Sequence, residues 1–494
     1  MHADIAMITR ALDEAGLLVE RRGTLPGTAV GIADDSRAVK PGGIFVAVRG
    51  TAADGHDYLD AAASAGAAMV IVEDAARASL PALPALVVRD ARRAAALAAG
   101  AAYGWPARQL QLVGVTGTNG KTTTVNMLRH LLDDREARSA SIGTLGVLIG
   151  SSGDSFEGGG GLTTPGPIEL QRVFRELVDR SVRRVAMEVS SHSLDQQRIE
   201  GVSFDAVTFT NFTRDHLDYH GSMEKYFAAK AKLLDYLVPH GTVVTNLDDM
   251  AWRRLSTERR RVAYSERVTS AEVHSEDVRF SPRGSEWTLV LDRERVHVRL
   301  PLIGDFNVIN ALGAAASAYS LGVPSDRVAN RLSSMPQIPG RLEVLRDAPA
   351  VLRDYAHTPD ALARALDAVR PFVPERLIVV FGCGGDRDRG KRPEMGHIAE
   401  DKADVAIVTS DNPRTEDPEK ILDEIETGMH RDHERIEDRR AAIARALEIA
   451  SSRDVVLLAG KGHETYQVRG TTKHPFDEKA IVDELSAGAA GVSR

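Results

Sequence analysis

The stretch Leu112-Val113-Gly114-Val115-Thr116-Gly117-Thr118-Asn119-Gly120-Lys121-Thr122-Thr123 decides the fold of this chain. An apolar run leads into a glycine-spaced turn, and a helical pattern follows through Leu132. Glycines let backbone N–H groups approach an anion, a helix N-terminus adds positive potential, and the lysine neutralises phosphate charge. The hydroxyl of Thr122 can bind Mg²⁺. Gly117 to Thr123 therefore predict a mononucleotide-binding phosphate loop, although Val115 stands where the common pattern has glycine.

Composition places the chain among ordinary globular proteins. It has 494 residues, 43% of them hydrophobic, a formal net charge of -8 and a single cysteine, Cys383. The negative charge argues against a general nucleic-acid-binding surface, and one cysteine allows no internal disulfide. No uncharged apolar run reaches about 18 residues, and Met1 to Arg10 lack the pattern of a secretory signal. We therefore predict a cytoplasmic protein with no membrane span and no nucleic-acid partner, and we expect a monomer.

Apolar runs of strand length alternate with helical segments along the whole chain. The runs are Ile44 to Val48, Met69 to Val72, Ala85 to Val88, Arg184 to Val189, Ala206 to Thr210, Gly241 to Thr245, Leu377 to Phe381, Val405 to Thr409 and Val455 to Ala459. Such alternation is typical of parallel, doubly wound sheets.

Breaks at Trp105-Pro106 and Pro339-Gly340-Arg341 divide the chain into parts whose lengths suit domains of ~150 residues. We predict an α/β fold with domains at residues 1–106, 107–338 and 339–494. The first is a small α/β unit, the second has a doubly wound, mostly parallel sheet with the phosphate loop, and the third is Rossmann-like.

Polar side chains follow two of the predicted central strands. Glu188 ends one strand and is followed by Ser190, and Asp215 and His216 lie in a loop after the next strand. Ligands gather at the carboxyl edge of parallel sheets, and Mg²⁺ prefers oxygen ligands. These residues are candidate metal or phosphate ligands. Taken alone, Glu188 could be a surface acid and the loop a helix-capping turn, while zinc is disfavoured because no cysteine is near.

Two further segments indicate little by themselves. Asp305-Phe306-Asn307-Val308-Ile309-Asn310-Ala311 opens an alanine-rich helix and could be a simple cap. Asp354-Tyr355-Ala356-His357-Thr358-Pro359-Asp360 follows a strand pattern and could be only a turn.

In combination, these motifs resemble the ATP-dependent Mur ligases of peptidoglycan synthesis. The resemblance rests on the phosphate loop, Glu188 to His192, Asn211 with Asp215-His216, Asn307 with Asn310, Pro339-Gly340-Arg341 and Asp354 to His357, in an order that spans the chain. The loop matches the family's own Gly-Thr-Asn-Gly-Lys-Thr version, which accounts for Val115. Asp35-Ser36-Arg37 to Gly42 and Asp54-Gly55-His56 resemble the members that add the third amino acid.

The resemblance implies a role for each motif. Ser36, Thr51, Ala52 and Ala53 hold the UDP end of UDP-MurNAc-L-Ala-D-Glu, and its peptide arm follows Thr163, Thr164, Ser190, Gln196 and Arg198. ATP is bound by Gly117 to Thr123 together with Asn307, Arg341 and Asp354. The implied catalytic residues are Lys121, Glu188, His216 and Lys230. The implied Mg²⁺ ligands are Thr122, Glu188, His216 and a carbamylated (N6-carboxylated) Lys230. The implied reaction forms an amide through an acyl phosphate.

The resemblance also suggests which amino acid is added. Asp411-Asn412-Pro413-Arg414 is similar to the signature of members that add meso-diaminopimelate. A guanidinium binds a carboxylate bidentately, and lysine would leave Arg414 without an anion. Arg387 would hold the other carboxylate, and Gly460 with Glu464 would receive the ammonium.

Several alternatives stay open. Asp411 to Arg414 could be an Asx-Pro turn with its arginine facing solvent. The enzyme could add L-lysine instead, or be a folylpolyglutamate synthetase, which shares the ligase architecture. A non-catalytic nucleotide-dependent binding protein is a further class, but Lys121, Glu188, His216 and Lys230 are all present. Cys383 is interpreted as a packed side chain and not as a nucleophile.

Overall fold

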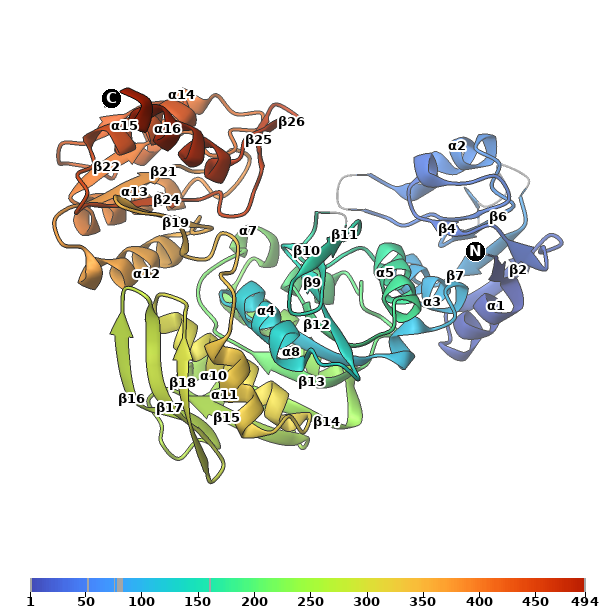
Figure 1. Cartoon of the computed structure of the whole chain (residues 1–494). Coiled ribbons are helices and arrows are strands. Elements are labelled where there is room, and N and C mark those ends of the chain that lie inside the picture. The colour runs from blue at the N-terminus through green and yellow to red at the C-terminus, as the bar shows by residue number, and fades with distance from the viewer. Residues whose placement is uncertain (1, 51–52, 75, 78–82, 160, 493–494) are drawn as a thin grey trace. The chain divides into compact units, whose positions relative to one another are not determined.

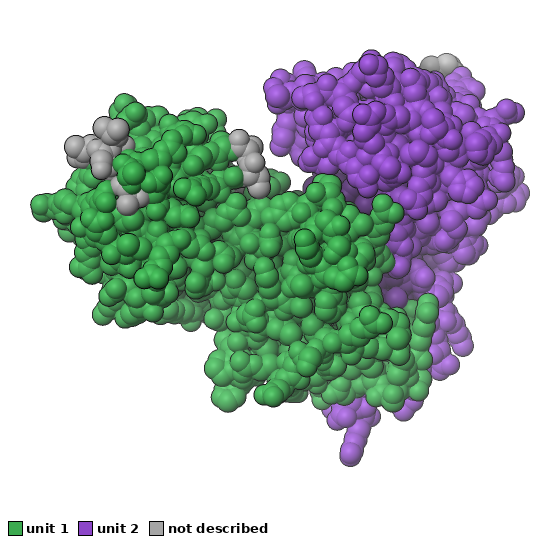
Figure 2. Space-filling view, turned by 180° about the vertical axis from the view of Figure 1, so that it is seen from behind, with its two compact units in different colours: residues 1–274, 312–328 green, residues 275–311, 329–494 purple. Residues whose placement is uncertain are grey.

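The protein is an α/β protein, as the sequence predicted. Its computed structural model describes residues 2–50, 53–74, 76–77, 83–159 and 161–492. The chain forms two compact units, Met1–His274 with Leu312–Val328 and Ser275–Ala311 with Ala329–Arg494 (Figure 2). The bounds of the three predicted domains stay a prediction. Among the described residues, no helix has both the length and the apolar character needed to span a membrane.

The first unit begins with a small sheet flanked by helices, drawn in blue in Figure 1. Its strand order is β2-β7-β6-β5-β4, and β2 alone runs antiparallel to its neighbour. The strands are β2 (Leu18–Arg22), β4 (Ile32–Ala33), β5 (Ile44–Val46), β6 (Met69–Val72) and β7 (Ala85–Val88), and β1 (Ala3–Asp4) pairs with β3 (Thr28–Ala29). The helices are α1 (Ile5–Glu14), α2 (Leu59–Ser64) and α3 (Ala91–Ala102).

The central sheet of this unit has the order β11-β10-β9-β12-β8-β13-β14-β15, and the first residues of β16 pair with β15. Pairing is parallel from β9 to β16 and antiparallel in β9-β10-β11. The strands are β8 (Gln111–Thr116), β9 (Arg138–Gly143), β10 (Gly146–Ile149), β11 (Asp154–Phe156), β12 (Val182–Glu188), β13 (Phe204–Phe209), β14 (Leu237–Asn246), β15 (Arg260–Ser265) and β16 (Val273–Ser281).

Helices connect these strands. They are α4 (Lys121–Leu132), α5 (Pro167–Asp179), α6 (Ser191–Asp195), α7 (Leu217–His220), α8 (Met223–Ala231) and α9 (Met250–Arg253). Two more, α10 (Asp305–Ser320) and α11 (Ser325–Ser333), contribute residues to both units.

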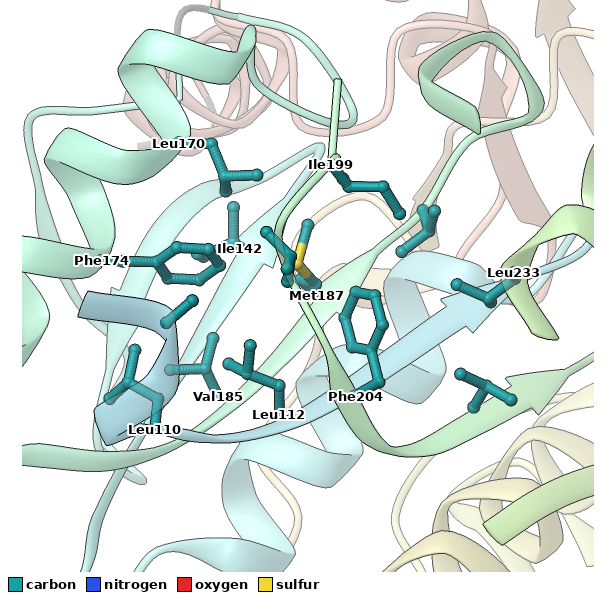
Figure 3. Packing of buried hydrophobic residues seen from close by; sticks show 14 of the residues in the cluster. Leu110, Leu112, Ile142, Leu170, Phe174, Val185, Met187, Ile199, Phe204 and Leu233 are labelled. Carbon is teal, nitrogen blue, oxygen red and sulfur yellow. The ribbon is translucent and has the colours of Figure 1, made fainter. Parts of the chain in front are cut away.

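A buried core lies between the central sheet and α5. Leu112, Val185 and Met187 from the strands pack with Leu170 and Phe174 of α5 (Figure 3). Each fully buried side chain of this size contributes roughly 1.5–3 kcal/mol. The core therefore fixes β8 and β12 side by side, with Val115 paired to Glu188 across the two strands.

The register brings three strand ends together. Thr116 of β8 pairs with Phe209 of β13, so the phosphate loop, Glu188 and the segment from Thr210 all begin at one edge. Ligands of parallel α/β sheets bind at this carboxyl edge.

The second unit contains a smaller doubly wound sheet. Its order is β19-β20-β24-β21-β22-β23, and all pairs except β19-β20 are parallel. The strands are β19 (Glu343–Asp347), β20 (Ala350–Asp354), β21 (Leu377–Phe381), β22 (Val405–Val408), β23 (Glu434–Arg435) and β24 (Val455–Ala459). The helices are α12 (Pro359–Val369), α13 (Lys391–Lys402), α14 (Pro418–Glu426), α15 (Arg439–Ile449) and α16 (Glu478–Val492). Two hairpins, β17 (Gly284–Leu291) with β18 (Glu294–Leu300) and β25 (Tyr466–Arg469) with β26 (Thr472–Pro475), belong to this unit.

Alternate side chains of its strands enter two separate cores. In β24, Leu457 packs in the core that α12, α13 and α14 cover, whereas Leu458 packs in the core that α15 and α16 cover. Successive strand residues face opposite sides of a sheet, so an entirely apolar strand needs helices on both sides. The Rossmann-like prediction for this part of the chain is confirmed.

Candidate active site

The phosphate loop lies between β8 and α4 and is held in place by the segment that follows β13. Asn211 accepts two backbone hydrogen bonds, from Thr118 N to its carbonyl oxygen at 2.8 Å and from Asn119 N to its Oδ1 at 2.8 Å. The Thr118 hydroxyl also donates to Thr213 O at 3.1 Å. These bonds fix the loop before any phosphate arrives, so little reorganisation is needed on binding.

Gly117 has no room for a side chain. Its φ is +153°, and a Cβ would come within 1.8 Å of the Thr210 hydroxyl and 3.0 Å of the carbonyl oxygen of Asn211. A glycine is thus needed here so that the phosphate loop and the segment from Thr210 can lie close together. From the sequence alone, this glycine is explained only by the approach of a phosphate.

Two lysines meet at the carbonyl oxygen of Gly117. Lys121 Nζ donates to Gly117 O at 2.9 Å and to Thr118 O at 2.8 Å, and Lys230 Nζ donates to Gly117 O at 2.7 Å. Lys230 is fully buried, on the last turn of α8. Burial, followed by the nearby Lys121 ammonium, lowers the pKa of Lys230 well below its usual value, while Asp215 acts in the opposite sense. Loss of the proton is therefore easier at Lys230 than at an exposed lysine.

Glu188 is buried at the end of β12. Thr144 donates to it twice, from its backbone N to Oε1 at 2.8 Å and from its hydroxyl to Oε2 at 3.2 Å. A Cβ on Gly143 would come within 2.2 Å of Glu188 Oε1, so the end of β9 limits where this carboxylate can lie. Glu188 is not the exposed surface acid that the residue alone could have been.

Residues that are predicted to contact the peptide arm of the substrate lie near Glu188. The Thr164 hydroxyl donates to the Glu188 carbonyl oxygen at 2.9 Å and accepts from Ser190 N at 3.0 Å. Arg198 donates to Thr164 O at 3.0 Å and to Gln196 Oε1 at 2.7 Å. Thr163 lies 3.3 Å from the Thr144 hydroxyl.

His216 lies in an aromatic and imidazole cluster. Its ring is edge-on to His192, with centroids 4.7 Å apart, and 6.0 Å from the ring of Tyr226. Desolvation lowers the pKa of His216, with Asp215 opposing the shift and His192 adding to it. The imidazole is therefore neutral at neutral pH, the form that can accept a proton or bind a metal.

The donor types at this edge suit Mg²⁺ better than zinc. Thr122 and Glu188 offer oxygen atoms, whereas Lys230 as an amine offers none and would need carbamylation to do so. In the part of the chain that the structure describes, no three His, Cys, Asp or Glu side chains form a group able to hold a metal ion.

The other predicted nucleotide contacts belong to the second unit. Asn307, in the first turn of α10, donates to Ile303 O at 2.7 Å, just before the helix begins. Asp354 Oδ2 accepts from Leu342 N at 2.8 Å, and the Arg341 guanidinium lies 4.8 Å from the centroid of the Tyr355 ring. Burial raises the pKa of Asp354, and Arg341 acts against this shift.

The predicted amino-acid pocket is a set of loops joined at the carboxyl edge of the C-terminal sheet. Arg414 is half-buried, has φ 52°, and donates to Gly385 O at 2.7 Å. Asn412 donates to Glu464 Oε2 at 2.9 Å. The guanidinium of Arg414 thus bonds the loop that carries Arg387, instead of only facing solvent.

Asp411 and Gly460 approach each other closely in this pocket. Asp411 is 7% exposed, and its Oδ2 has no hydrogen-bond partner among the described residues. A Cβ on Gly460 would come within 2.5 Å of that oxygen. Cys383 is buried nearby, and burial raises the pKa of its thiol to about 12, which agrees with a packing role.

At the N-terminal sheet, Ser36 begins a short 3-10 helix that Asp35 caps by accepting from Arg37 N at 2.9 Å. Ala53 accepts a bond from Gly50 N at 2.8 Å. Thr51 and Ala52 lie outside the described residues.

Sequence reasoning missed several residues that shape these sites. Tyr226 bonds the Thr118 hydroxyl at 3.3 Å and lies under Lys230 Nζ, 4.5 Å from its ring centroid. Its position four residues before Lys230 on one helix was a usable signal. Thr144 had no such signal in the sequence, because this residue lies 44 positions from its partner Glu188 and no local pattern connects the two.

Comparison with known families accounts for most of the chain. Residues 28–104 match the family model described as Mur ligase family, catalytic domain; residues 115–318 match the Mur ligase middle domain; and residues 340–462 match the Mur ligase, glutamate ligase domain.

Individual proteins similar to this chain have names from the same family. A protein of Gloeobacter violaceus named UDP-N-acetylmuramoyl-L-alanyl-D-glutamate--2,6-diaminopimelate ligase is 44% identical over 455 residues, covering 91% of this chain and 92% of that protein. A solved structure of a ligase with that name is 33% identical, with a TM-score of 0.67 and coverage of 96% and 98%. Folylpolyglutamate synthase of Mycobacterium tuberculosis, complexed with ADP and AMPPCP, is 19% identical with a TM-score of 0.63, covers 74% of this chain and 92% of that one, and shares the fold alone.

Proposed function

Because the chain belongs to the Mur ligase family, we propose that it joins meso-2,6-diaminopimelate to UDP-N-acetylmuramoyl-L-alanyl-D-glutamate with ATP. The observation that supports the choice of amino acid is a pair of contacts in the segment 411–414. The Arg414 guanidinium donates to Gly385 O at 2.7 Å, and Asn412 donates to Glu464 Oε2 at 2.9 Å. Relatives named for this reaction, 44% identical over most of the chain, support the same choice.

The reaction has two steps. The terminal carboxylate of the D-glutamate attacks the γ-phosphorus of ATP, the bond to the bridging oxygen breaks, and ADP leaves. The amine of diaminopimelate then attacks the acyl phosphate, expels inorganic phosphate and gives up a proton. Positioning and charge neutralisation dominate the phosphoryl step. Lys121, whose Nζ lies on the loop carbonyls of Gly117 and Thr118, supplies positive charge where the outer phosphates would bind.

We assign Mg²⁺ to Thr122, Glu188, His216 and a carbamylated Lys230. When bound, Mg²⁺ would screen charge between the phosphates and the attacking carboxylate. Thr144 holds the Glu188 carboxylate in place, and the neutral His216 is able to bind or accept a proton.

Carbamylation of Lys230 requires a neutral amine, which attacks CO₂ and releases a proton. The buried position and lowered pKa of Lys230 support this step. Carbon-13 NMR of protein equilibrated with labelled CO₂ should show a carbamate signal that Lys230→Ala lacks. If the wild-type protein shows no signal, the assignment of Lys230 is wrong.

The remaining assignments also follow from the resemblance to the Mur ligase family. Ser36 with Thr51 to Ala53 would hold the UDP end, and Thr163, Thr164, Ser190, Gln196 and Arg198 would line the peptide arm. Asn307, Arg341 and Asp354 would bind the nucleotide. Arg387, Asp411 to Arg414, Gly460 and Glu464 would bind diaminopimelate. We place the reaction in the cytoplasm, where ATP and UDP-linked precursors occur, and expect a monomer.

A ligation assay tests the proposal. ADP release is measured with UDP-N-acetylmuramoyl-L-alanyl-D-glutamate, ATP, Mg²⁺ and either meso-diaminopimelate or L-lysine, and the product is confirmed by mass. We expect activity with diaminopimelate, strong loss of it in Arg414→Ala, and none in Lys121→Ala. A preference for L-lysine would refute the choice of amino acid, and activity only with a folate substrate would refute the reaction.

A further inference from the structure

Lys461 is a fully buried lysine in the loop between β24 and β25. Its Nζ donates to Glu464 Oε2 at 2.9 Å and to Asn412 Oδ1 at 3.1 Å. Tyr466 and Phe476 enclose it, with ring centroids 5.9 and 6.0 Å from Nζ. Because its exposure is 0%, Lys461 can act on a substrate only indirectly, through the groups that it bonds and through its charge.

The three polar side chains form a closed triangle. Asn412 donates from Nδ2 to Glu464 Oε2 at 2.9 Å, and its Oδ1 accepts from Lys461 and from Val468 N, the latter at 2.9 Å. Two donors on Oδ1 leave the amide only one orientation. Two donors on Oε2 of Glu464 leave Oε1 as the oxygen with remaining capacity for a substrate ammonium.

Lys461 also sets the net charge of the pocket. Residues 411–414 and 460–464 carry two carboxylates, Asp411 and Glu464, and two cations, Arg414 and Lys461, so with His463 neutral their formal charges cancel. The adjacent Asp386 and Arg387 add one charge of each sign. A buried charge is weakly screened, so this balance bears directly on which ligand is accepted.

The zero formal charge of the pocket suits diaminopimelate better than lysine. The distal end of diaminopimelate carries a carboxylate and an ammonium and is neutral, whereas the distal end of lysine carries an ammonium alone. Without Lys461 the pocket would carry one excess negative charge, which favours the lone cation. Specificity is a difference between two affinities, and a fixed internal cation lowers one of them.

We propose that Lys461 is a positioning residue that determines specificity: it orients Asn412 and Glu464 and neutralises the pocket, so that diaminopimelate is favoured over lysine. This inference rests on the proposed function. It predicts that removing the charge changes the choice between the two amino acids, and not only the overall activity.

The test compares Lys461→Met with Lys473→Met in the full-length enzyme. Lys473 is exposed and its Nζ lies 4.1 Å from the centroid of the same Tyr466 ring, so the control removes a cation of this hairpin outside the pocket. In Lys461→Met, we expect the KM for diaminopimelate to rise about tenfold, with the KM values for ATP and the UDP substrate within about twofold of wild type. The ratio of kcat/KM for lysine to that for diaminopimelate should also rise about tenfold, and Lys473→Met should leave it unchanged.

Two further variants separate charge from structure. Glu464→Gln retains Lys461 and shifts the pocket by one positive charge, so the lysine ratio should fall below that of wild type. This variant keeps the inference testable if Lys461→Met does not fold, as judged by thermal melting. The double variant Lys461→Met with Glu464→Gln is formally neutral, and its lysine ratio should return toward wild type although its activity is low.

The outcomes are distinct. A folded Lys461→Met with an unchanged ratio, or a Glu464→Gln ratio that rises, overturns the inference while wild-type ligation of diaminopimelate leaves the proposed function intact. A wild-type enzyme that does not ligate diaminopimelate overturns the proposed function itself.

Discussion

Gly143→Ala tests whether Glu188 works from the position in which the structure holds it. A Cβ at this position would lie 2.2 Å from Glu188 Oε1, 2.7 Å from Cδ and 2.8 Å from Cγ, whereas real Cβ atoms essentially never come within 3.0 Å of another atom. The carboxylate must therefore retreat by about 1 Å, a displacement that can lower a rate about 100-fold. That factor corresponds to about 2.7 kcal/mol in the activation barrier.

The same retreat strains two hydrogen bonds. Thr144 donates to Glu188 from N at 2.8 Å and from its hydroxyl at 3.2 Å, and bonds to a charged acceptor contribute about 1.5–3 kcal/mol each. We expect kcat for ADP release to fall about 100-fold, with a lower melting temperature and a smaller change in the KM for diaminopimelate. Gly27→Ala is the matched control, because nothing lies within 4 Å of its added Cβ.

A double-mutant cycle measures the coupling between Gly143 and Glu188. In a Glu188→Ala background the clash is gone, so Gly143→Ala should cost little further activity. If Gly143→Ala alone keeps kcat within about threefold of wild type, the position of Glu188 does not limit catalysis and the reasoning is wrong.

Three more predictions concern other parts of the chain. Tyr226→Phe removes the bond to the Thr118 hydroxyl but keeps the ring, so steady-state kinetics should show a rise in the KM for ATP corresponding to about 0.5–1.5 kcal/mol, and a KM unaltered within error would contradict this. The side-chain hydrogen bond from Arg376 lowers the pKa of Asp454 to about 2, so its stabilisation is complete above the unfolded pKa near 4 and is lost as the pH falls toward 2. Asp454→Asn should therefore flatten the acid-induced fall in melting temperature. Gly340→Ala, with φ +66° and a Cβ 2.3 Å from a backbone nitrogen of the 460–464 loop, should destabilise the second unit in thermal melts.

Strand positions could be predicted where apolar side chains are buried on both faces. Leu377–Phe381 and Val455–Ala459 have the bounds that the sequence indicated, because every residue in them enters one of two cores. The hairpin of β17 and β18 was not predicted. In β18, charged side chains alternate with apolar ones and several are exposed, so the segment lacks a continuous apolar run.

The candidate site could be predicted only where a motif is local. The phosphate loop is a contiguous stretch, and the register of β8, β12 and β13 puts its predicted neighbours at the same edge. Contacts such as Thr144 with Glu188 depend on how β9 lies beside β12, which no spacing in the sequence reveals. The resemblance to a family supplied Lys230. By its local sequence alone this residue could be an exposed lysine on a helix, whereas the structure buries it.

An asparagine holds each of the two predicted ligand-binding loops, but the two use different atoms. Asn211 accepts from the backbone of the predicted phosphate loop, and Asn412 bonds Val468 N and Glu464 in the predicted amino-acid pocket. Each side chain joins a strand end to a neighbouring loop, and a short amide can both accept and donate there without adding charge. At Asn412 the donor is essential, because a carboxylate in its place would face Glu464, whereas Asn211 uses only its oxygen atoms in the bonds to the loop. The phosphate loop thus needs an acceptor at Asn211, whereas the position of Asn412 needs a neutral group that both accepts and donates.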